Sequence, residues 1–461
     1  MFKIILEKEL REILGTKKFA LTFGICSLLI LLAFYAGASN YRISKLQYDN
    51  SIAENLHQME GLPRWDNIDH RLFLPPQPLA SLVSGVSNDV GRTIRVTVNY
   101  YELTPRGTRF NENPIFAVFR FLDLEFIFSV VISLFAILFG YDSINGEKER
   151  GTLRLTFSNS LPRDQYILGK LVGSFLALIV PLMIPILIGC LLLPILGVPM
   201  DADTWLRLGM IILLGFLYIG VFSTLSIFVS AMTKRSSSSF LMLLVVWIFA
   251  VLIIPRTAVL LAARSADVPS IDVIDHEKTF VKRQINDERR AEISQWLREN
   301  TSLRTANPEQ WAKDRTKFFG AAWVEYLKKT GQMHERITEN RENKVLARQR
   351  TALAFSRMSP TSSFSIAASE LASTSLALRN AYVNSAKDYR PIFDEFLRGF
   401  DNQDEDIPGG VDPSLLPVYQ FVGPSTKAAI RASLPDFGLL LMFNLVWFVG
   451  AFVAFLRYDV R

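Results

Sequence analysis

Cysteine and histidine are scarce in this sequence. The two cysteines, Cys26 and Cys190, both fall inside apolar blocks, so we expect neither a disulfide nor a thiolate metal site in the water-exposed segments. The four histidines are His57, His70, His276 and His334. Glu follows both His276 and His334, as at the start of the zinc-protease helix motif, but the second His four positions later is missing in both cases.

Motifs for nucleotide binding and hydrolysis are lacking as well. The Gly-x-Ser-x-Gly element of α/β-hydrolases does not occur. Gly169-Lys170 resembles the end of a phosphate loop, but Leu171 stands where Ser or Thr would bind Mg²⁺, and the upstream glycine is missing. We therefore expect no catalytic, cofactor-binding or metal-binding residue in this chain. If ATP drives the protein, another chain must bind the ATP and Mg²⁺.

Six apolar blocks dominate what the sequence does contain. Half of the 461 residues are hydrophobic, and only 20% are charged, against about 25% in soluble domains. About 20 apolar residues in a helix match the roughly 30 Å hydrocarbon core of a bilayer, which excludes a soluble protein, a single-anchor protein and a β-barrel with strands of ~10 residues. The predicted transmembrane helices are 19–38, 118–141, 171–197, 208–232, 240–262 and 437–456.

Lys and Arg gather in alternate connections between these blocks. They are frequent in residues 1–18, in residues 142–170, between helices four and five, and after helix six, whereas residues 198–206 have none. Because cytoplasmic loops carry the excess of Lys and Arg, we expect both termini in the cytoplasm. Residues 1–18 are predicted to form an amphipathic helix on the inner lipid interface. Its apolar face comprises Phe2, Ile5, Leu6, Leu10, Ile13 and Leu14.

Two long connections then fall on the extracytoplasmic side. Segment 39–117 is predicted to contain a helix from Arg42 to about Met59 and a half-buried strand. The residues sharing the inner face of that strand are Ile94, Val96, Val98 and Tyr100. Segment 263–433 has 25 Lys and Arg and 23 Asp and Glu, which is too much charge for lipid, so we expect a water-exposed domain. Its nearly balanced charge gives no reason to expect nucleic-acid binding.

Helix signals dominate the second of these segments. Asn307-Pro308 is typical of an N-cap followed by a proline at the first helical position, and Gly331 is a predicted stop. Ser359-Pro360 is predicted to start another helix that reaches about Tyr389. We therefore expect this segment to be mostly helical.

The connection after helix two is the most informative stretch. Residues 146–170 read GEKERGTLRLTFSNSLPRDQYILGK, longer than a bare two-helix hairpin requires. Leu153, Leu155 and Phe157 are apolar although the loop is expected to lie in water. A charged helix with exposed apolar residues suits docking into a groove on a cytoplasmic partner. A solvated loop lying on the lipid headgroups is the alternative.

This stretch resembles the hallmark of permease subunits of ABC-2 type transporters. The shared features are an acidic pair, Gly-Thr-Leu, a few apolar residues, a Pro-Arg turn and Gly-Lys. The chain is most similar to the branch described as multi-copper enzyme maturation permeases, in which a large extracytoplasmic domain of unknown function precedes the last helix. Residues 76–85, 142–146 and 358–360 are also similar to that branch, whereas residues 159–161 depart from its usual small-residue turn.

The resemblance implies an all-α polytopic, type V exporter-like fold with six transmembrane helices. It places a mostly helical extracytoplasmic domain between helices five and six, and a smaller α/β segment between helices one and two. It also implies a homo- or heterodimer of permeases in the bacterial inner membrane, with two cytoplasmic ABC ATPase subunits. A single coupling helix would run from Glu147 to Phe157. The residues implied to contact the ATPase are Glu147, Glu149, Arg150, Gly151, Thr152, Leu153, Leu155 and Phe157, with Lys234 and Arg235 of the 233–239 loop as a second contact.

Three functions remain open at this stage. The first is a transport subunit that exports an unknown substrate. The second is a mechanical transmitter, in which the ectodomain acts on an extracytoplasmic protein partner and nothing crosses the membrane. The third is a scaffold or sensor without an ATPase. A continuous polar cavity between helices two and five would favour transport, and a sealed apolar dimer seam would favour transmission.

Overall fold

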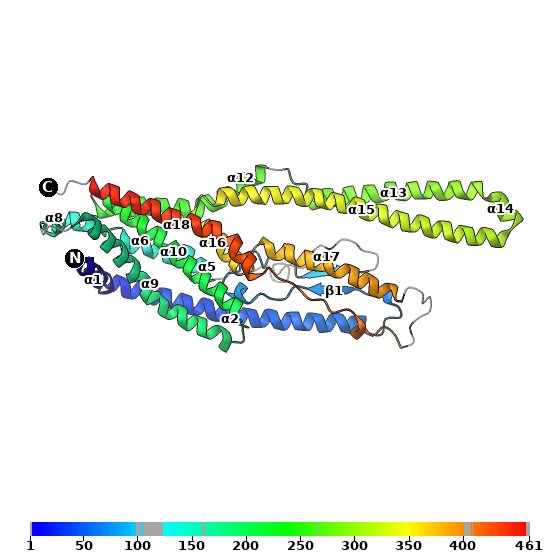
Figure 1. The fold of residues 1–461 in the computed structure, drawn as a ribbon, viewed down its shortest axis with the longest axis horizontal. Helices are drawn as coiled ribbons and strands as arrows, with labels where there is room; N and C mark the ends of the chain where they lie inside the picture. Colours follow the sequence, from blue (N-terminus) through cyan, green and yellow to red (C-terminus); the bar gives the residue numbers. More distant parts are fainter. Residues whose placement is uncertain are drawn as a thin grey trace. The chain divides into compact units, whose positions relative to one another are not determined.

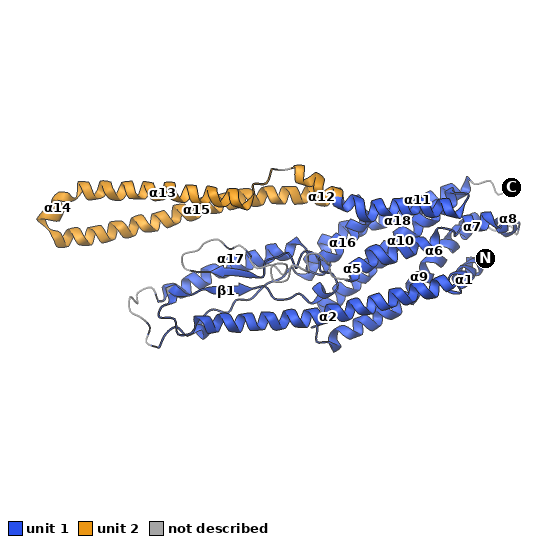
Figure 2. Ribbon diagram, turned by 180° about the vertical axis from the view of Figure 1, so that it is seen from behind, with its two compact units in different colours: residues 1–256, 356–461 blue, residues 257–355 orange. Residues whose placement is uncertain are grey.

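The computed structural model describes residues 2–97, 103, 105, 123–158, 162–265, 267–400, 407 and 409–457. Helices make up most of it (Figure 1), which confirms the predicted all-α class. The chain forms two compact units (Figure 2): Met1–Arg256 with Ser356–Arg461, and Thr257–Phe355. The predicted domain 263–433 is therefore divided, because its last part belongs to the first unit.

Within the described residues, six helical segments are long and apolar enough to cross a membrane, which confirms a multi-pass membrane protein. They are Lys17–Met59 (α2), Leu124–Glu149 (α5 Leu124–Phe126, η3 Ile127–Ile132, α6 Ser133–Gly140 and α7 Asn145–Glu149), Arg163–Ile195 (α9), Ala202–Met232 (α10), Ser236–Ser265 (α11 Ser236–Trp247, η4 Ile248–Ile253 and α12 Ile254–Ser265) and Thr426–Leu456 (α18). The helix predicted from Arg42 is the continuation of α2. Residues 118–122, the predicted start of the second span, lie outside the described residues.

Helix α10 lies at the centre of the bundle. Gly215 allows close packing there, because a Cβ atom at this position would lie 2.4 Å from Cε1 of Phe128. The fully buried Tyr218 donates a hydrogen bond to the carbonyl oxygen of Ser129 at 2.9 Å. Spans two and five are joined by Trp247, whose Nε1 donates to Oγ of Ser133 at 2.9 Å beside the π-helical turns η3 and η4. The centre of the bundle thus contains hydrogen-bonded polar groups as well as apolar side chains.

Helix α16 (Pro360–Leu371) packs against α10 and α18 inside the same unit. It begins at the predicted Ser359-Pro360 signal, with the Ser359 hydroxyl as N-cap. The prediction of one helix to Tyr389 is wrong, because the chain breaks at Ser373, whose φ of 54° is left-handed, before α17 (Leu376–Arg398) begins. Arg357 anchors the start of α16 to α18 through the buried carboxylate of Asp436, with N–O distances of 2.7 and 2.9 Å.

A second apolar cluster holds α17 against a small sheet. Strands β1 (His70–Phe73) and β2 (Thr93–Val96) are antiparallel, with His70 opposite Val96. Ile94 and Val96 are fully buried as predicted, whereas Val98 and Tyr100 lie outside the described residues. Tyr382 of α17 fixes the sheet by hydrogen bonding to the carbonyl oxygens of Leu72 (2.7 Å) and Arg92 (3.0 Å). The predicted smaller α/β segment is therefore completed by α17.

His70 lies buried in this cluster between Tyr389 and Phe393. Its Nε2 is 3.1 Å from the Tyr389 hydroxyl, and its ring stacks on Phe393 at 5.6 Å between centroids. Burial lowers the pKa of His70 to about 4, because the charged imidazolium would lose its hydration. The ring is therefore neutral at physiological pH.

The second unit is a helical hairpin of α13 (Ile271–Glu299), α14 (Thr301–Ala306) and α15 (Pro308–Ser356) (Figure 2). The predicted start of α15 is confirmed, because Oδ1 of Asn307 accepts from the backbone N–H of Gln310 at 3.2 Å. The predicted stop at Gly331 is wrong: α15 continues to Ser356. One glycine costs only about 1 kcal/mol in a helix, which the rest of a long helix offsets.

Candidate functional site

The connection after span two forms a corner rather than one helix. Helix α7 (Asn145–Glu149) continues the span, and α8 (Thr152–Phe157) follows after a turn at the end of the bundle where α1 lies (Figure 1). Gly151 makes the turn with a φ of 71°, a left-handed conformation that other residues disfavour. The predicted single helix from Glu147 to Phe157 is therefore wrong, and residues 159–161 lie outside the described part of the chain.

Glu147 points into the protein. Its side chain is only 2% exposed, and Oε1 lies 2.9 Å from Nζ of Lys8 and 3.0 Å from Nζ of Lys170. Its Oε2 accepts a hydrogen bond of 2.8 Å from the Tyr166 hydroxyl. Both carboxylate oxygens are thus engaged within the chain. Glu147 therefore holds α7 in position, and its contact with the ATPase stays a prediction that would require these bonds to open.

Glu9 brings helix α1 (Phe2–Leu14) into the same network. Its Oε2 lies 2.6 Å from Nζ of Lys170, and Oε1 accepts from the hydroxyls of Ser143 (3.2 Å) and Ser174 (3.3 Å). The two negative charges of Glu9 and Glu147 are balanced by the two positive charges of Lys8 and Lys170. The Lys8 side chain is 45% exposed, whereas that of Lys170 is 3% exposed. Removing one partner of such a buried pair costs about 3–5 kcal/mol, because it leaves a buried charge without compensation.

Two glycines of α9 allow α1 to lie this close. A Cβ atom at Gly169 would lie 2.7 Å from Cγ2 of Ile5, and one at Gly173 would lie 2.8 Å from Cβ of Glu9. The two glycines are four residues apart and therefore share one helix face. The buried residues of α1 are Ile5, Glu9 and Ile13, so the apolar face predicted from the sequence contains a buried acid between two of its members.

Helix α7 also binds the turn between α10 and α11. Nζ of Lys148 donates to the carbonyl oxygen of Ala231 at 2.6 Å, which is favourable because the end of a helix carries partial negative charge. The carboxylate of Glu149 accepts from the backbone N–H (3.0 Å) and hydroxyl (2.8 Å) of Ser236, in the first turn of α11. Hydrogen bonds thus join the two stretches predicted to contact the ATPase, residues 147–157 and the 233–239 loop.

Around this corner lies an exposed group of residues that we call the α8 surface. It comprises Arg150, Gly151, Arg154, Leu155, Lys234 and Arg235. Leu155 is 70% exposed and is its large apolar residue. Leu153 is buried, Thr152 is half-buried, and Phe157 packs edge-on against Tyr166 at 5.2 Å between ring centroids. Of the three apolar residues predicted to face a partner, Leu155 is exposed, Phe157 is half-buried and Leu153 is buried.

Sequence reasoning missed the residues that fix this corner from behind: Lys8, Glu9, Tyr166 and Lys170. The one local signal was the position of Glu9, four residues from both Ile5 and Ile13 and therefore on the apolar face of α1. Gly169-Lys170, which resembles the end of a phosphate loop, has a different use here. The glycine admits α1, and the lysine pairs with carboxylates.

The chain was compared with known protein families and with curated proteins. The model of a family described as ABC-2 family transporter protein matches residues 3–460. A search among curated proteins finds no match to the chain. The matched range includes the six spans, the charged network behind α7 and the α8 surface.

Proposed function

Since this chain belongs to the ABC-2 family of transporter proteins and is a membrane-spanning permease component, we propose that a separate cytoplasmic ATPase subunit drives it through the α8 surface. Membership of this family implies an ATP-binding partner subunit and a dimer of permeases. In the proposed complex the partner subunit holds the ATP and Mg²⁺. Membership of the multi-copper enzyme maturation branch stays a prediction.

The α8 surface must face the cytoplasm for this proposal to hold, because ATP is available there. The distribution of Lys and Arg supports that orientation, since the connections at the α8 end are basic and residues 198–206 at the other end of the spans have none. The proposal therefore has both termini in the cytoplasm and the protein in a bacterial inner membrane.

One observation carries the coupling role: α7 is bound on three sides while α8 presents an exposed leucine. Glu147 connects α7 to α9 through Lys170, and Lys148 and Glu149 connect it to the ends of α10 and α11. A rigid short helix that is held in this way passes a displacement of α8 to spans two to five together. An ATPase that binds the α8 surface differently in its ATP-bound and ATP-free states would bias the permease between two conformations.

The proposed output is export of a substrate by a permease dimer. Membership of a transporter family supports transport as the output. Tyr218 and Trp247 place hydrogen-bonding atoms between the spans, where they join neighbouring helices.

Replacing Leu155 with Asp tests the docking role, because it puts a charge into the apolar contact and leaves the buried network intact. We expect wild-type chain purified from its native membrane to carry ATP-hydrolysing activity and an ATPase-sized subunit. The L155D variant should lose most of both. Burial of one Leu contributes about 1.5–3 kcal/mol, so the affinity should fall at least about tenfold.

Leu415→Asp is the matched control, because Leu415 is also exposed (58%) but belongs to the segment 413–415 before α18. It should co-purify with the same activity as wild type. Unchanged ATPase activity in the L155D eluate would refute the docking surface, and wild-type chain free of any ATP-hydrolysing subunit would refute the proposed function as a whole.

A further inference from the structure

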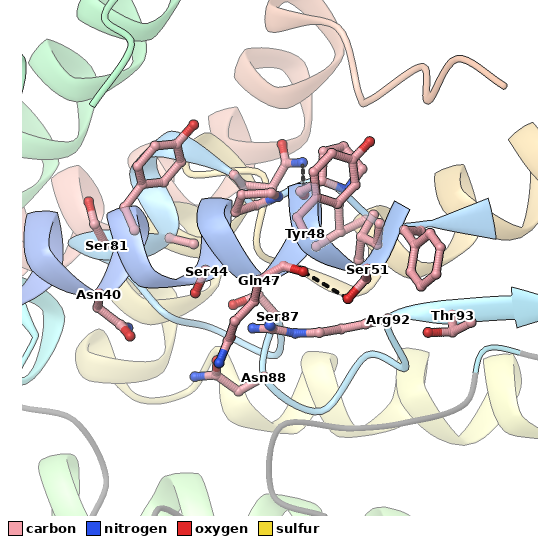
Figure 3. A pocket seen from close by; sticks show the side chains of 18 of the residues that line it. Asn40, Ser44, Gln47, Tyr48, Ser51, Ser81, Ser87, Asn88, Arg92 and Thr93 are labelled. Atoms are coloured by element: carbon pink, nitrogen blue, oxygen red, sulfur yellow. Dashed lines mark hydrogen bonds between the residues drawn. The ribbon is translucent and has the colours of Figure 1, made fainter. Parts of the chain in front are cut away.

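A cleft lies beside the second half of α2, in the same unit as the small sheet. Its volume is about 400 Å³, within the range of small-molecule sites. One wall is α2, which contributes Asn40, Ser44 and Gln47, and the facing wall is the loop before β2 (Figure 3). The α8 surface, the charged network and the bundle centre use none of these residues.

The lining is polar but almost uncharged. Amides and hydroxyls predominate, and Figure 3 shows Gln47 of α2 beside Ser87, Asn88 and Arg92. Gln47 is exposed and Asn88 is half-buried, so both amides are open to a ligand. Among the described residues that line the cleft, Arg92 is the charged side chain and neither Asp nor Glu occurs. A cationic ligand would therefore find no counter-charge, whereas a neutral or singly negative one would fit.

Aromatic rings supply part of the apolar lining, together with Leu74, Leu378 and two prolines. Tyr41, Tyr48 and Phe73 all border the cleft. Ring faces beside amide and hydroxyl groups are the combination that binds sugars, because a pyranose has apolar C–H faces and a rim of hydroxyl groups. Each amide both donates and accepts hydrogen bonds, which matches a hydroxyl group.

The walls of the cleft are held in place without a ligand. The carbonyl oxygen of Arg92 accepts from Leu74 N–H at 2.9 Å and from the Tyr382 hydroxyl at 3.0 Å. Asn55 ties α2 to the strand by donating to the carbonyl oxygen of Asp69 at 3.0 Å and accepting from Arg71 N–H at 3.0 Å. A preformed site loses little conformational entropy on binding, so a small ligand can bind with useful affinity.

From this geometry we propose that the cleft binds a hydroxyl-rich small molecule, neutral or with one negative charge, of the mono- or disaccharide class. Gln47 and Asn88 hydrogen-bond the ligand hydroxyls from opposite walls, and the tyrosine rings cover its apolar face. This site is independent of ATPase coupling, so its test does not depend on the proposed function.

Calorimetric titration of the detergent-purified full chain tests the proposal. The probes are D-glucose, maltose and D-glucuronate, with glycylglycine as a peptide of comparable size. We expect saturable binding of at least one sugar at up to millimolar concentration. Gln47→Ala and Asn88→Ala should each weaken that binding about three- to tenfold, since each removes hydrogen bonds to a neutral group.

Gln58→Ala is the matched control, because Gln58 lies exposed on the same helix and does not line the cleft. It should bind like wild type, and all variants should elute as wild type on gel filtration. Binding of none of the three sugars, binding of the dipeptide in preference to them, or sugar binding that neither the Q47A nor the N88A variant weakens would each overturn the proposal.

Discussion

Replacing Lys170 with Met should release helix α1 from the bundle. The change keeps the length of the side chain but leaves Glu9 without its cationic partner at 2.6 Å and Glu147 with only Lys8, which is 45% exposed. Stranding a buried charge in this way costs about 3–5 kcal/mol. Every 1.4 kcal/mol is a factor of ten, so the open state of α1 should become on the order of a hundred- to a thousandfold more populated.

Maleimide labelling of an introduced cysteine measures this opening. Ile13→Cys reports it, because Ile13 is 8% exposed, while Leu14→Cys is the open control at 42%. Native Cys26 and Cys190 are both buried, so background labelling of these two residues should be slow. In the K170M background the cysteine at position 13 should label on the order of a hundredfold faster than in wild type, while the one at position 14 labels at the same rate in both.

Neutralising Glu9 should reverse the effect. Gln at position 9 needs no counter-charge and can still hydrogen-bond Ser143 and Ser174, so K170M with E9Q should label at least about tenfold more slowly than K170M alone. Lys3→Met controls for loss of charge, because Lys3 is exposed on the same helix. Equal labelling at position 13 in wild type and K170M, or faster labelling on adding E9Q, would refute the charged network as the element that holds α1.

Two further predictions concern close packing and pH. Gly173→Ala should speed maleimide labelling of the cysteine at position 13 about tenfold, because the added Cβ would lie 2.8 Å from Cβ of Glu9. Gly24→Ala is the control, because a Cβ there has nothing within 4 Å, and it should leave the rate unchanged. Equal labelling rates in the Gly173→Ala variant and wild type would contradict the close packing of α1. The sheet cluster should lose stability as pH falls from 7 to 5, since the unfolded chain binds a proton at His70 near pH 6.5 and the folded chain only near pH 4. The free energy of unfolding should be about 2 kcal/mol lower at pH 5 than at pH 7. The apparent melting temperature of the His70→Phe variant should therefore depend less on pH than that of wild type. Identical pH profiles of the melting temperature in the two proteins would rule out this role of His70.

The six spans could be predicted because each rests on a local property, a run of about 20 apolar residues. The ends of these helices were harder to predict, because a helix continues beyond the lipid wherever the following residues also favour a helix. Helix α2, for example, continues to Met59. The break at Ser373 has no glycine or proline to announce it. Helix α16 packs against α10 and α18, which are distant from it in the sequence, so its local sequence does not contain these contacts.

The corner after span two shows the same limit for function. Glycine, the acidic residues and alternating leucines predict a docking region here, but they did not distinguish Leu155, which is exposed, from Leu153, which is buried. Leu153 is buried because it belongs to an apolar cluster that includes Tyr166 and Phe455 from other helices. Likewise the sequence predicts a surface position for Glu147, and only the folded structure shows that Nζ of Lys170 lies 3.0 Å from its carboxylate.

Photo-cross-linking from position 155 in native membranes tests the central claim most directly. With a benzophenone amino acid in place of Leu155, we expect an adduct with an ATP-binding subunit, and none from the buried position 153. No adduct from position 155, or an adduct with a protein on the outer side of the membrane, would contradict the account.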